Sequence, residues 1–285
     1  MADHEEEATA APLELSAGDV LALGRLLGAA EGVDLSYYTP NFIARRMSVR
    51  MRRTNCATTA GYLAGLARDP AEIKALVAAL TVNVTEFFRD AEVYQTIRDR
   101  VLPILLDGPP RRLQIWSAGC ATGQEPYTLA MILEDAIAAR PGCSYRIYAS
   151  DISPRQLAAA KAAVYPREAA ARVPARHRRC FVDAGEGRVA VAPAVKANVT
   201  FFPHDLSGGQ AIPAAGLDLI LCRNVMIYFA PDAVKRLLES FHKSLAPERF
   251  LVLGASETIL RDDFFRPFDV KNKIYRRVPS KPGTP

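Results

Sequence analysis

The sequence of 285 residues lacks several patterns that would place it in a special class of protein. It has no run of 18 apolar residues, so we expect no insertion into a membrane. Its five cysteines form no C-x-x-C pair and its four histidines are scattered, which argues against structural zinc and predicts no bound metal. The first residues are acidic, unlike a secretory signal, so we expect a cytoplasmic protein with reduced thiols.

The composition is typical of a globular protein, with 49% apolar and 24% charged residues. A net charge of +5 favours an acidic partner. We expect a disordered tail over residues 1–12, a helical domain over 13–80, a linker over 81–95 and an α/β domain over 96–285. No strand-like alternation appears between Leu13 and Leu80. Helix starts are predicted at Asp19, as the cap of a helix to Ala30, and at Thr39-Pro40 and Asp69-Pro70.

The predicted helix from Pro40 to about Arg53 carries five arginines within roughly 160° of arc. They are Arg45, Arg46, Arg50, Arg52 and Arg53, whereas Ala44, Met47 and Met51 lie on the opposite side. A solvated face is the usual fate of such a charge run. The alternative is a docking surface for an acidic partner, either nucleic acid phosphates or a carboxylate-rich protein helix.

Residues 113–130, LQIWSAGCATGQEPYTLA, predict a strand, a glycine turn and a helix. Such a unit lets a ligand approach bare backbone near a helix N-terminus. The dinucleotide pattern G-x-G-x-x-G fails at Ala121, and the turn is closer to that of S-adenosylmethionine-dependent methyltransferases. Ser117 stands where those enzymes usually have an acidic residue at the end of the strand, and Glu125 could supply the carboxylate. The alternative is an ordinary strand–helix turn.

From Arg112 onward, strands and helices alternate, which predicts a doubly wound parallel sheet. A second strand ends at Asp151, where nucleoside-binding folds hold ribose hydroxyls; the alternative role for Asp151 is the N-cap of a helix at Pro154. Further strands are expected at 199–202, 217–222 and 250–253, with a final antiparallel strand over 269–278. A small β-insertion at about 165–198 is predicted to contain a hairpin of 181–182 with 188–191.

Two polar groups of residues flank these elements. Asn224 and Tyr228 follow the buried strand 217–222 and are expected to face the ligand crevice, with buried structural hydrogen bonding as the alternative. Asn83, Thr85 and Arg89 lie beside Phe87-Phe88, which we expect to be buried at the junction between the domains. The alternative for this segment is a helix cap at Thr85.

Several long motifs occur together: TVNVTEFFRD at 81–90, IWSAGCATGQEPYTLAM at 115–131, ASDIS at 149–153, CRNVMIYF at 222–229 and LVLGASE at 251–257. With them the chain resembles the bacterial chemotaxis receptor methyltransferases, the CheR family, from about Asp19 to Val278. The resemblance implies an all-helical N-terminal domain and a class I S-adenosylmethionine (SAM) methyltransferase domain. It implies transfer of the SAM methyl group to glutamates on the cytoplasmic helices of chemoreceptors, with glutamate methyl esters and S-adenosylhomocysteine (SAH) as products.

The resemblance also assigns residues. Asn83, Thr85 and Arg89 would contact the cofactor, Gly119 belongs to its glycine turn, and Glu125 and Asp151 would hold the methionine and ribose portions. Asp205 and Leu206 would flank the adenine, and Asn224 and Val225 would close the site. Because a glutamate is already ionised at neutral pH, no general base is required. We hypothesise that Arg89 and Tyr228 orient the substrate carboxylate.

The expected partners are chemoreceptors that dock on the five arginines; we expect a monomer and no nucleic acid. The loop from Asp183 to Arg188 is short compared with family members that tether to a receptor pentapeptide, which favours a pentapeptide-independent enzyme. One rival function is SAM-dependent methylation of RNA or a small molecule, and the lack of an aromatic stacking platform beside the arginines weakens the RNA case. Another is a non-catalytic module that binds SAM as a signal.

Overall fold

The computed structural model describes residues 13–80, 85–208, 214–259 and 264–279. The chain divides into two compact units. The helical unit comprises Met1–Val82 together with Tyr228–Ala233, and the sheet unit comprises Asn83–Ile227 and Val234–Pro285. The chain therefore contributes to the helical unit twice.

In residues 13–80, the described N-terminal part of the helical unit, four α-helices pack around one apolar core. They are α2 (Ala17–Glu31), α3 (Pro40–Arg53), α4 (Thr59–Leu66) and α5 (Pro70–Leu80), with the short 3₁₀ helix η2 (Leu35–Tyr37) before α3. Leu23, Leu27, Met47 and Leu76 in the core have no exposed surface. The prediction of an all-helical N-terminal domain is thus confirmed for the residues that the structure describes.

The predicted helix starts are correct at two of three places. The Thr39 hydroxyl accepts a hydrogen bond from the amide of Phe42, and the Asp69 carboxylate accepts one from the amide of Ala71. The first prediction is wrong, because Ser16 is the N-cap of α2 and Asp19 is its third residue. Their side chains bond reciprocally to each other's backbone amides, a capping box that satisfies two amide groups at the helix start.

The segment Tyr228–Ala233 joins the helical unit through backbone and ring contacts. The amide of Thr39 donates to the carbonyl of Tyr228 (3.0 Å), and the amide of Ala230 donates to that of Tyr37 (2.8 Å). The Tyr228 ring packs on Phe42 with 4.6 Å between ring centroids. These contacts explain why this short segment groups with helices that lie far from it in the sequence.

Among the described residues of the sheet unit, the main sheet has seven strands in the order β6-β2-β1-β7-β8-β10-β9. Their bounds are β1 Arg112–Ala118, β2 Ser144–Asp151, β6 Val199–Pro203, β7 Leu217–Cys222, β8 Leu245–Leu253, β9 Phe265–Asp269 and β10 Ile274–Arg277. The strands from β6 to β8 pair in parallel, whereas β10 is antiparallel to both β8 and β9. The predicted doubly wound parallel sheet is confirmed.

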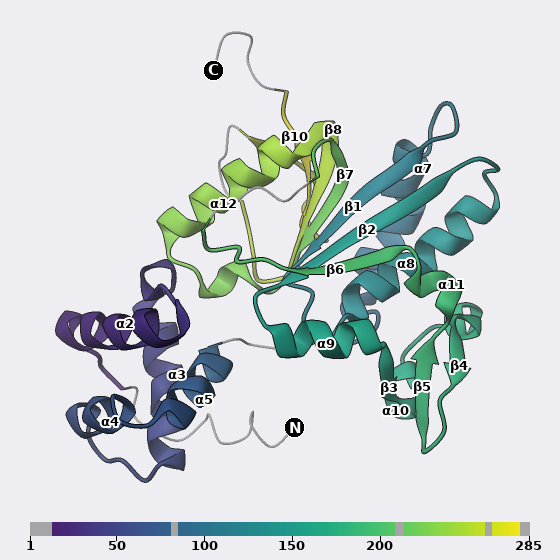
Figure 1. The fold of residues 1–285 in the computed structure, drawn as a ribbon. Coiled ribbons are helices and arrows are strands. Elements are labelled where there is room, and N and C mark those ends of the chain that lie inside the picture. The colour runs from purple at the N-terminus through teal and green to yellow at the C-terminus, as the bar shows by residue number, and fades with distance from the viewer. Residues whose placement is uncertain (1–12, 81–84, 209–213, 260–263, 280–285) are drawn as a thin grey trace. The chain divides into compact units, whose positions relative to one another are not determined.

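Helices cover both faces of this sheet (Figure 1). Side chains alternate across a strand, so Ile115 and Trp116 of β1 face opposite layers. Ile115 belongs to the core with Leu129 and Met131 of α8 (Gln124–Ala138). Trp116 meets Phe241 of α12 (Pro231–Ser244) at 5.3 Å between ring centroids. The same face includes the ring of His204, which follows β6.

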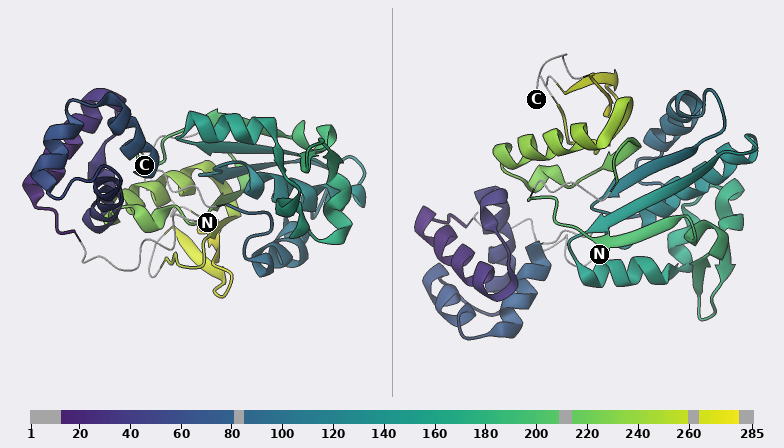
Figure 2. Two further views of the ribbon diagram at one scale, coloured as in Figure 1. Left: turned by 90° about the horizontal axis from the view of Figure 1, so that it is seen from below. Right: turned by 45° about the horizontal axis from the view of Figure 1, so that its top comes forward.

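Three boundaries differ from the prediction. The final antiparallel strand expected over 269–278 is present as β10 but begins only at Ile274, after a turn. The preceding strand β9 was not predicted, and it forms a hairpin with β10 at the sheet edge (Figure 2). The strand expected at Phe250 begins at Leu245. The helix expected from Ala91 to Leu106 consists of α6 (Ala91–Thr96), the π-helical turn η3 (Ile97–Val101) and α7 (Leu102–Leu105).

The β-insertion is a separate three-stranded antiparallel sheet, β3-β5-β4. It comprises β3 (Val164–Pro166), β4 (Phe181–Asp183) and β5 (Arg188–Val191), with α10 (Arg167–Ala171) packed against β3 and β5. The 3₁₀ helix η4 (Ala175–Cys180) and α11 (Pro193–Lys196) contact α8, whereas α9 (Pro154–Ala162), which precedes the insertion in sequence, packs against β2 and β6 of the main sheet. The predicted hairpin of β4 and β5 is confirmed. The third strand, β3, was not predicted from the sequence.

Candidate functional site

Three parallel strands of the sheet unit end side by side at one edge. In the pairing of β1 with its neighbours, Ala118 is opposite Ser150 of β2, and Ser117 is opposite Leu221 of β7. The chain leaves β1 for β2 and β6 on one side and returns to β7 on the other. Parallel sheets bind ligands at the carboxyl ends of the strands where the order reverses in this way. The glycine turn, Asp151 and Arg223 follow these strand ends and therefore surround that crevice.

The glycine turn between β1 and α8 is held by the end of β2. Gly119 and Cys120 both donate their amides to the carbonyl of Ser150, at 2.8 and 2.9 Å. The Asp151 carboxylate accepts the amide of Ala121 at 2.9 Å, and Ala121 has a φ of +45°. Gly119 has a φ of +78°, a conformation that favours glycine. The turn is therefore shaped by this carboxylate as well as by its glycines.

The alternative interpretation of Asp151 as a helix cap is wrong. Ser153 is the N-cap of α9, and its hydroxyl accepts the amide of Gln156. Asp151 instead accepts the amides of Ala121 and Ser153, each at 2.9 Å. Burial raises the pKa of the Asp151 carboxyl, and the hydrogen bonds from these amides oppose that shift. A buried carboxylate at the end of the second strand is well placed to accept hydrogen bonds from ligand hydroxyls.

Glu125 lies in the first turn of α8, beside the same strand ends. Its carboxylate accepts a hydrogen bond from the Ser117 hydroxyl at 2.8 Å, and the Arg223 guanidinium lies 3.6 Å from its other oxygen. Burial raises the pKa of the Glu125 carboxyl, and the positive charges of Arg223 and Arg89 oppose this. Ser117, which stands where an acidic residue is usual, thus binds the Glu125 carboxylate through its hydroxyl.

Arg223 connects the end of β7 to the segment before α6, and no local sequence pattern distinguishes it. Its buried guanidinium donates to the Asp90 carboxylate at 2.6 Å and to the Arg89 carbonyl at 3.1 Å. The other terminal nitrogen donates to the Tyr94 hydroxyl at 3.2 Å. Arg223 and Asp90 are 133 residues apart in sequence, so local pattern could not reveal the pair.

The segment 85–90 has no helix, so the alternative of a helix cap at Thr85 is wrong. Phe87 and Phe88 are buried in the core of the sheet unit, as predicted. The Phe88 amide donates to the Thr128 hydroxyl on α8 at 3.1 Å, and Phe88 and Asp90 both have positive φ angles. Non-glycine residues in this strained region often occur at functional sites. Asn83 lies outside the described residues.

The loop after β7 contacts the glycine turn. A Cβ atom built on Gly119 would lie 2.6 Å from Cγ2 of Val225, which shows how closely the loop approaches. Asn224 has a φ of +60°, and the carboxylate of Glu257 accepts the amides of Asn224, Val225 and Met226. Glu257 belongs to the motif LVLGASE but was not singled out by sequence analysis. Its three partners in this loop lie 31 to 33 residues away in the sequence, so no local pattern indicates these hydrogen bonds.

Other predicted site residues lie in different surroundings. Asp205 is exposed, and its carboxylate accepts the amide and the hydroxyl of Ser207, whereas Leu206 is buried. Tyr228 belongs to the helical unit, where its ring packs on Phe42. Thr85 and Arg89 are half-buried in the sheet unit.

The arginine face of α3 is partly neutralised by α5, which the sequence pattern did not reveal. Arg50 makes a two-pronged ion pair with Glu72, at 2.9 and 2.5 Å, and the Tyr62 hydroxyl donates to the same carboxylate at 2.6 Å. Hydrogen bonding to Arg50 lowers the pKa of the Glu72 carboxyl. The Arg46 guanidinium lies over the Phe42 ring. Arg45, Arg52 and Arg53 are exposed.

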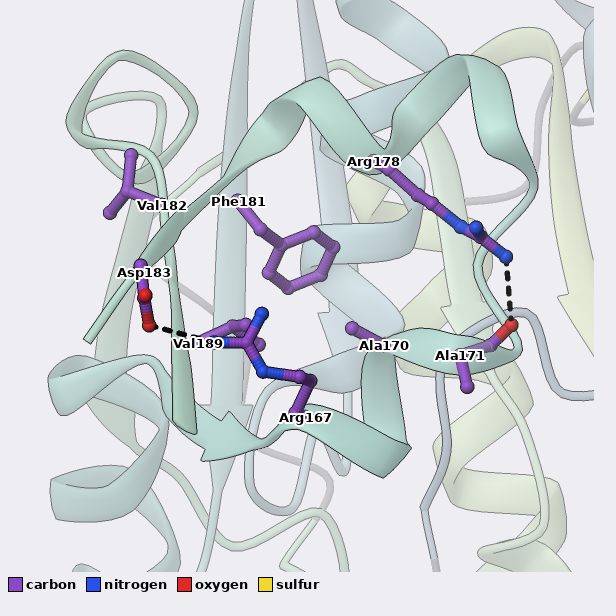
Figure 3. Close-up of a pocket in the computed structure, with 8 residues that line it drawn as sticks. All are labelled: Arg167, Ala170, Ala171, Arg178, Phe181, Val182, Asp183 and Val189. Atoms are coloured by element: carbon purple, nitrogen blue, oxygen red, sulfur yellow. Dashed lines mark hydrogen bonds and ion pairs between the residues drawn. The ribbon is translucent and has the colours of Figure 1, made fainter. Parts of the chain in front are cut away.

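A separate cavity of about 390 Å³ opens on the β-insertion (Figure 3). Phe181 of β4 projects into it, and Arg167 pairs with Asp183 at its rim. Arg178 donates to the carbonyl of Ala171 on the opposite side. None of the residues lining this cavity was predicted as a site residue.

The described part of the chain contains neither a candidate membrane span nor a candidate metal site. No helix among residues 13–80, 85–208, 214–259 and 264–279 is long and apolar enough to cross a membrane. In the same residues, no group of three or more His, Cys, Asp or Glu side chains could hold a metal ion.

Comparison with known proteins agrees with this architecture. Residues 83–274 match the CheR methyltransferase SAM-binding domain, and residues 21–81 match the CheR methyltransferase all-alpha domain. The fold and the match together define a class I SAM-dependent methyltransferase with an all-helical N-terminal domain.

The relatives make the assignment more specific. A chemotaxis protein methyltransferase of Listeria monocytogenes is 30% identical over 243 residues, which cover 85% of this chain and 90% of that protein. Chemotaxis protein methyltransferase 1 of Vibrio cholerae is 40% identical over 196 residues, covering 67% of this chain and 70% of that one. An uncharacterised 104.1 kDa protein of Rhodobacter capsulatus is 31% identical over 270 residues, but this chain spans only 28% of its length. The chain belongs to the CheR methyltransferase family.

The residues at the crevice fit SAM as cofactor. SAM carries an ammonium group and ribose hydroxyls, both of which donate hydrogen bonds. The Asp151 carboxylate is buried at the end of β2, and the Glu125 carboxylate, in the first turn of α8, is partly buried. Burial raises the pKa of each, so a hydrogen-bond donor or a positive charge beside them would be favourable. The turn around Gly119 lets a ligand approach the backbone closely.

Proposed function

We propose that this protein methylates glutamate side chains on the cytoplasmic helices of chemoreceptors and so takes part in chemotactic adaptation. The observation that carries the proposal is the match of both units to the CheR methyltransferase domains, together with relatives named chemotaxis protein methyltransferases. The exposed arginines of α3 support it, since an acidic receptor helix would complement them.

The reaction needs little acid–base chemistry from the protein. SAM, when bound, supplies a methyl group on a positively charged sulfur. An ionised glutamate oxygen of the receptor forms a bond to that carbon while the sulfur–carbon bond breaks, which leaves a methyl ester and a neutral thioether. No proton is transferred, so the protein's task is to bring the two groups into line.

We propose specific roles for the chain's residues in this task. Glu125 would hold the ammonium of the methionine portion, and Asp151 the ribose hydroxyls. Asn83, Thr85 and Arg89 would approach the cofactor from the segment before α6. Asp205 and Leu206 would flank the adenine, and Asn224 and Val225 would close the site at the end of β7.

Arg89 and Tyr228 are proposed to orient the incoming carboxylate. The backbone of Arg89 is fixed by the hydrogen bond from Arg223, and the ring of Tyr228 is fixed by Phe42. A fixed backbone at Arg89 and a packed ring at Tyr228 favour precise positioning of these two side chains. The exposed arginines of α3 would attract the receptor helix, and the short β4–β5 loop favours action without a pentapeptide tether.

A methyl-transfer assay tests this function. The purified full-length protein is incubated with SAM carrying a tritiated methyl group and with membranes that contain chemoreceptors. Methyl esters hydrolyse in base, so we expect volatile tritiated methanol after alkali treatment, and none when the membranes are omitted. Base-stable counts would instead indicate methylation of nitrogen or RNA, and SAH binding without any transfer would indicate a signalling module.

A further inference from the structure

The carboxylate of Glu257 lies at the meeting point of two loops of the sheet unit. Its Oε2 accepts the amides of Asn224 (3.0 Å) and Gly254 (2.6 Å), and its Oε1 accepts those of Val225 (2.9 Å) and Met226 (2.7 Å). The residue is only 4% exposed. Buried backbone amides require hydrogen-bond acceptors, and this one carboxylate is the acceptor for four amides.

The four hydrogen bonds hold the loop after β7 in a conformation that it would not readily adopt alone. Asn224 has a φ of +60°, which is unfavourable for a residue with a side chain. A Cβ atom on Gly254 would lie 2.7 Å from the Asn224 amide nitrogen and 2.8 Å from Oε2 of Glu257. Glycine at 254 therefore allows the two loops and the carboxylate to meet.

The loop held in this way forms one side of the cofactor crevice. Val225, whose amide is bound to Glu257, packs directly against Gly119 of the glycine turn. Glu257 thus acts on the turn through Val225. We propose that Glu257 is a positioning residue for the cofactor site, which sets the affinity for SAM and SAH by fixing residues 224–226 against Gly119. This inference rests on the cofactor placement in the proposed function.

A purely structural role would have a different consequence. If Glu257 only joined the ends of β7 and β8, its loss would lower the stability of the folded protein, but the protein that remained folded would bind SAH normally. If Glu257 positions the loop, the binding-competent conformation becomes a minority even in the folded protein. The apparent affinity for SAH then falls in proportion to the fraction of folded molecules that keep the binding-competent conformation.

The experiment compares Glu257→Gln with Asp218→Asn in the full chain. Asp218 is a matched control, because it is a fully buried carboxylate at the opposite end of β7 that accepts the Gln114 amide at 2.9 Å and pairs with Arg111. Thermal unfolding measures stability, and calorimetric titration with SAH measures affinity per folded molecule. We expect both variants to unfold at lower temperature, whereas only Glu257→Gln raises the dissociation constant for SAH, by about ten-fold.

Equal SAH affinity in Glu257→Gln and the unaltered protein would overturn the inference. If Glu257→Gln does not fold, Gly254→Ala serves instead, because a Cβ there would lie within 2.8 Å of both the Asn224 amide nitrogen and Oε2 of Glu257 and so disturb their hydrogen bond while residue 257 keeps its carboxylate. Unchanged affinity would again overturn the inference. Absence of SAH binding by the unaltered protein is a distinct result, which would refute the cofactor placement itself.

Discussion

Replacing Gly119 by alanine should damage the site in a way that can be separated into two contributions. The backbone there has a φ of +78°, which a residue with a side chain adopts at a cost of about 1–2 kcal/mol. The added Cβ would also lie 2.6 Å from Cγ2 of Val225, against an ordinary carbon–carbon contact of about 3.5–4.0 Å. Overpacking of this kind costs about 1–3 kcal/mol more.

Gly216→Ala isolates the first contribution. Gly216 immediately precedes β7, has a φ of +71° and has nothing within 4 Å of a built Cβ. This variant should therefore lose only the 1–2 kcal/mol of the backbone, and Gly119→Ala about 2–5 kcal/mol. At about 2–4 °C per kcal/mol for a domain of this size, the two melting temperatures should differ by several degrees.

A double variant and a binding measurement complete the test. Gly119→Ala with Val225→Ala removes the colliding methyl group, so we expect it to be more stable than Gly119→Ala alone, with a favourable coupling energy of about 0.5–3 kcal/mol. Calorimetric titration with SAH should show weakened binding in Gly119→Ala and unchanged binding in Gly216→Ala. Equal melting temperatures for the two single variants would refute the close approach of the loop to the turn.

Three further predictions concern charges. Arg50 lowers the pKa of the Glu72 carboxyl, so the stabilising effect of this ion pair is complete above the ordinary pKa of 4.5 and is lost as the pH falls through the lowered value. Protection of α3 and α5 from hydrogen exchange should decline over that pH range. Glu72→Gln should be about 1–3 kcal/mol less stable at neutral pH and should not show this decline. The pKa of the Glu125 carboxyl is raised, so the affinity for SAH should fall as the pH drops through that raised value. Calorimetry should show that Glu125→Gln binds SAH more weakly and with an affinity that does not change with pH. If the affinities of the variant and the unaltered protein instead change in parallel with pH, the ammonium contact is contradicted. Arg52→Glu should raise KM for receptor a few-fold at low salt without changing SAH affinity, whereas Arg25→Glu, the same charge change at an exposed position of α2, should leave KM unaltered.

The parts of the fold that follow from local pattern were predicted correctly. The buried run 217–222, the Thr39-Pro40 helix start and the alternation from Arg112 each depend on residues close in sequence. The terminal hairpin was not predicted, because its strands β9 and β10 have only five and four residues and both contain charged residues. The sequence pattern therefore does not distinguish two such strands from one strand with a loop. The cap of α2 was misplaced by three residues because Ser16 and Asp19 bond to each other's amides, so either is a plausible start.

In the candidate site, local motifs could point only to residues next to the strand ends, and the roles predicted for them stay predictions. Gly119, Glu125 and Asp151 stand beside the strands that position them, so a motif reveals them. Arg223 and Glu257 were missed because their partners come from distant segments: Asp90 lies 133 residues from Arg223, and Asn224 lies 33 residues from Glu257. Likewise, the pairing of Arg50 with Glu72 needed the packing of α3 against α5, which no helical periodicity describes.

The double contribution of the chain to the helical unit has a consequence for protein engineering. Within residues 228–233, Phe229 forms an isolated antiparallel β-bridge with Tyr38, and its two neighbours hydrogen-bond to the backbone of Thr39 and Tyr37. The residues on either side of this segment in the sequence belong to the sheet unit. A chimaera that grafts another relative's N-terminal helices onto this sheet would break those contacts unless the donor's counterpart of 228–233 travels with the helices. The helical unit should therefore be exchangeable between relatives only as a two-segment cassette.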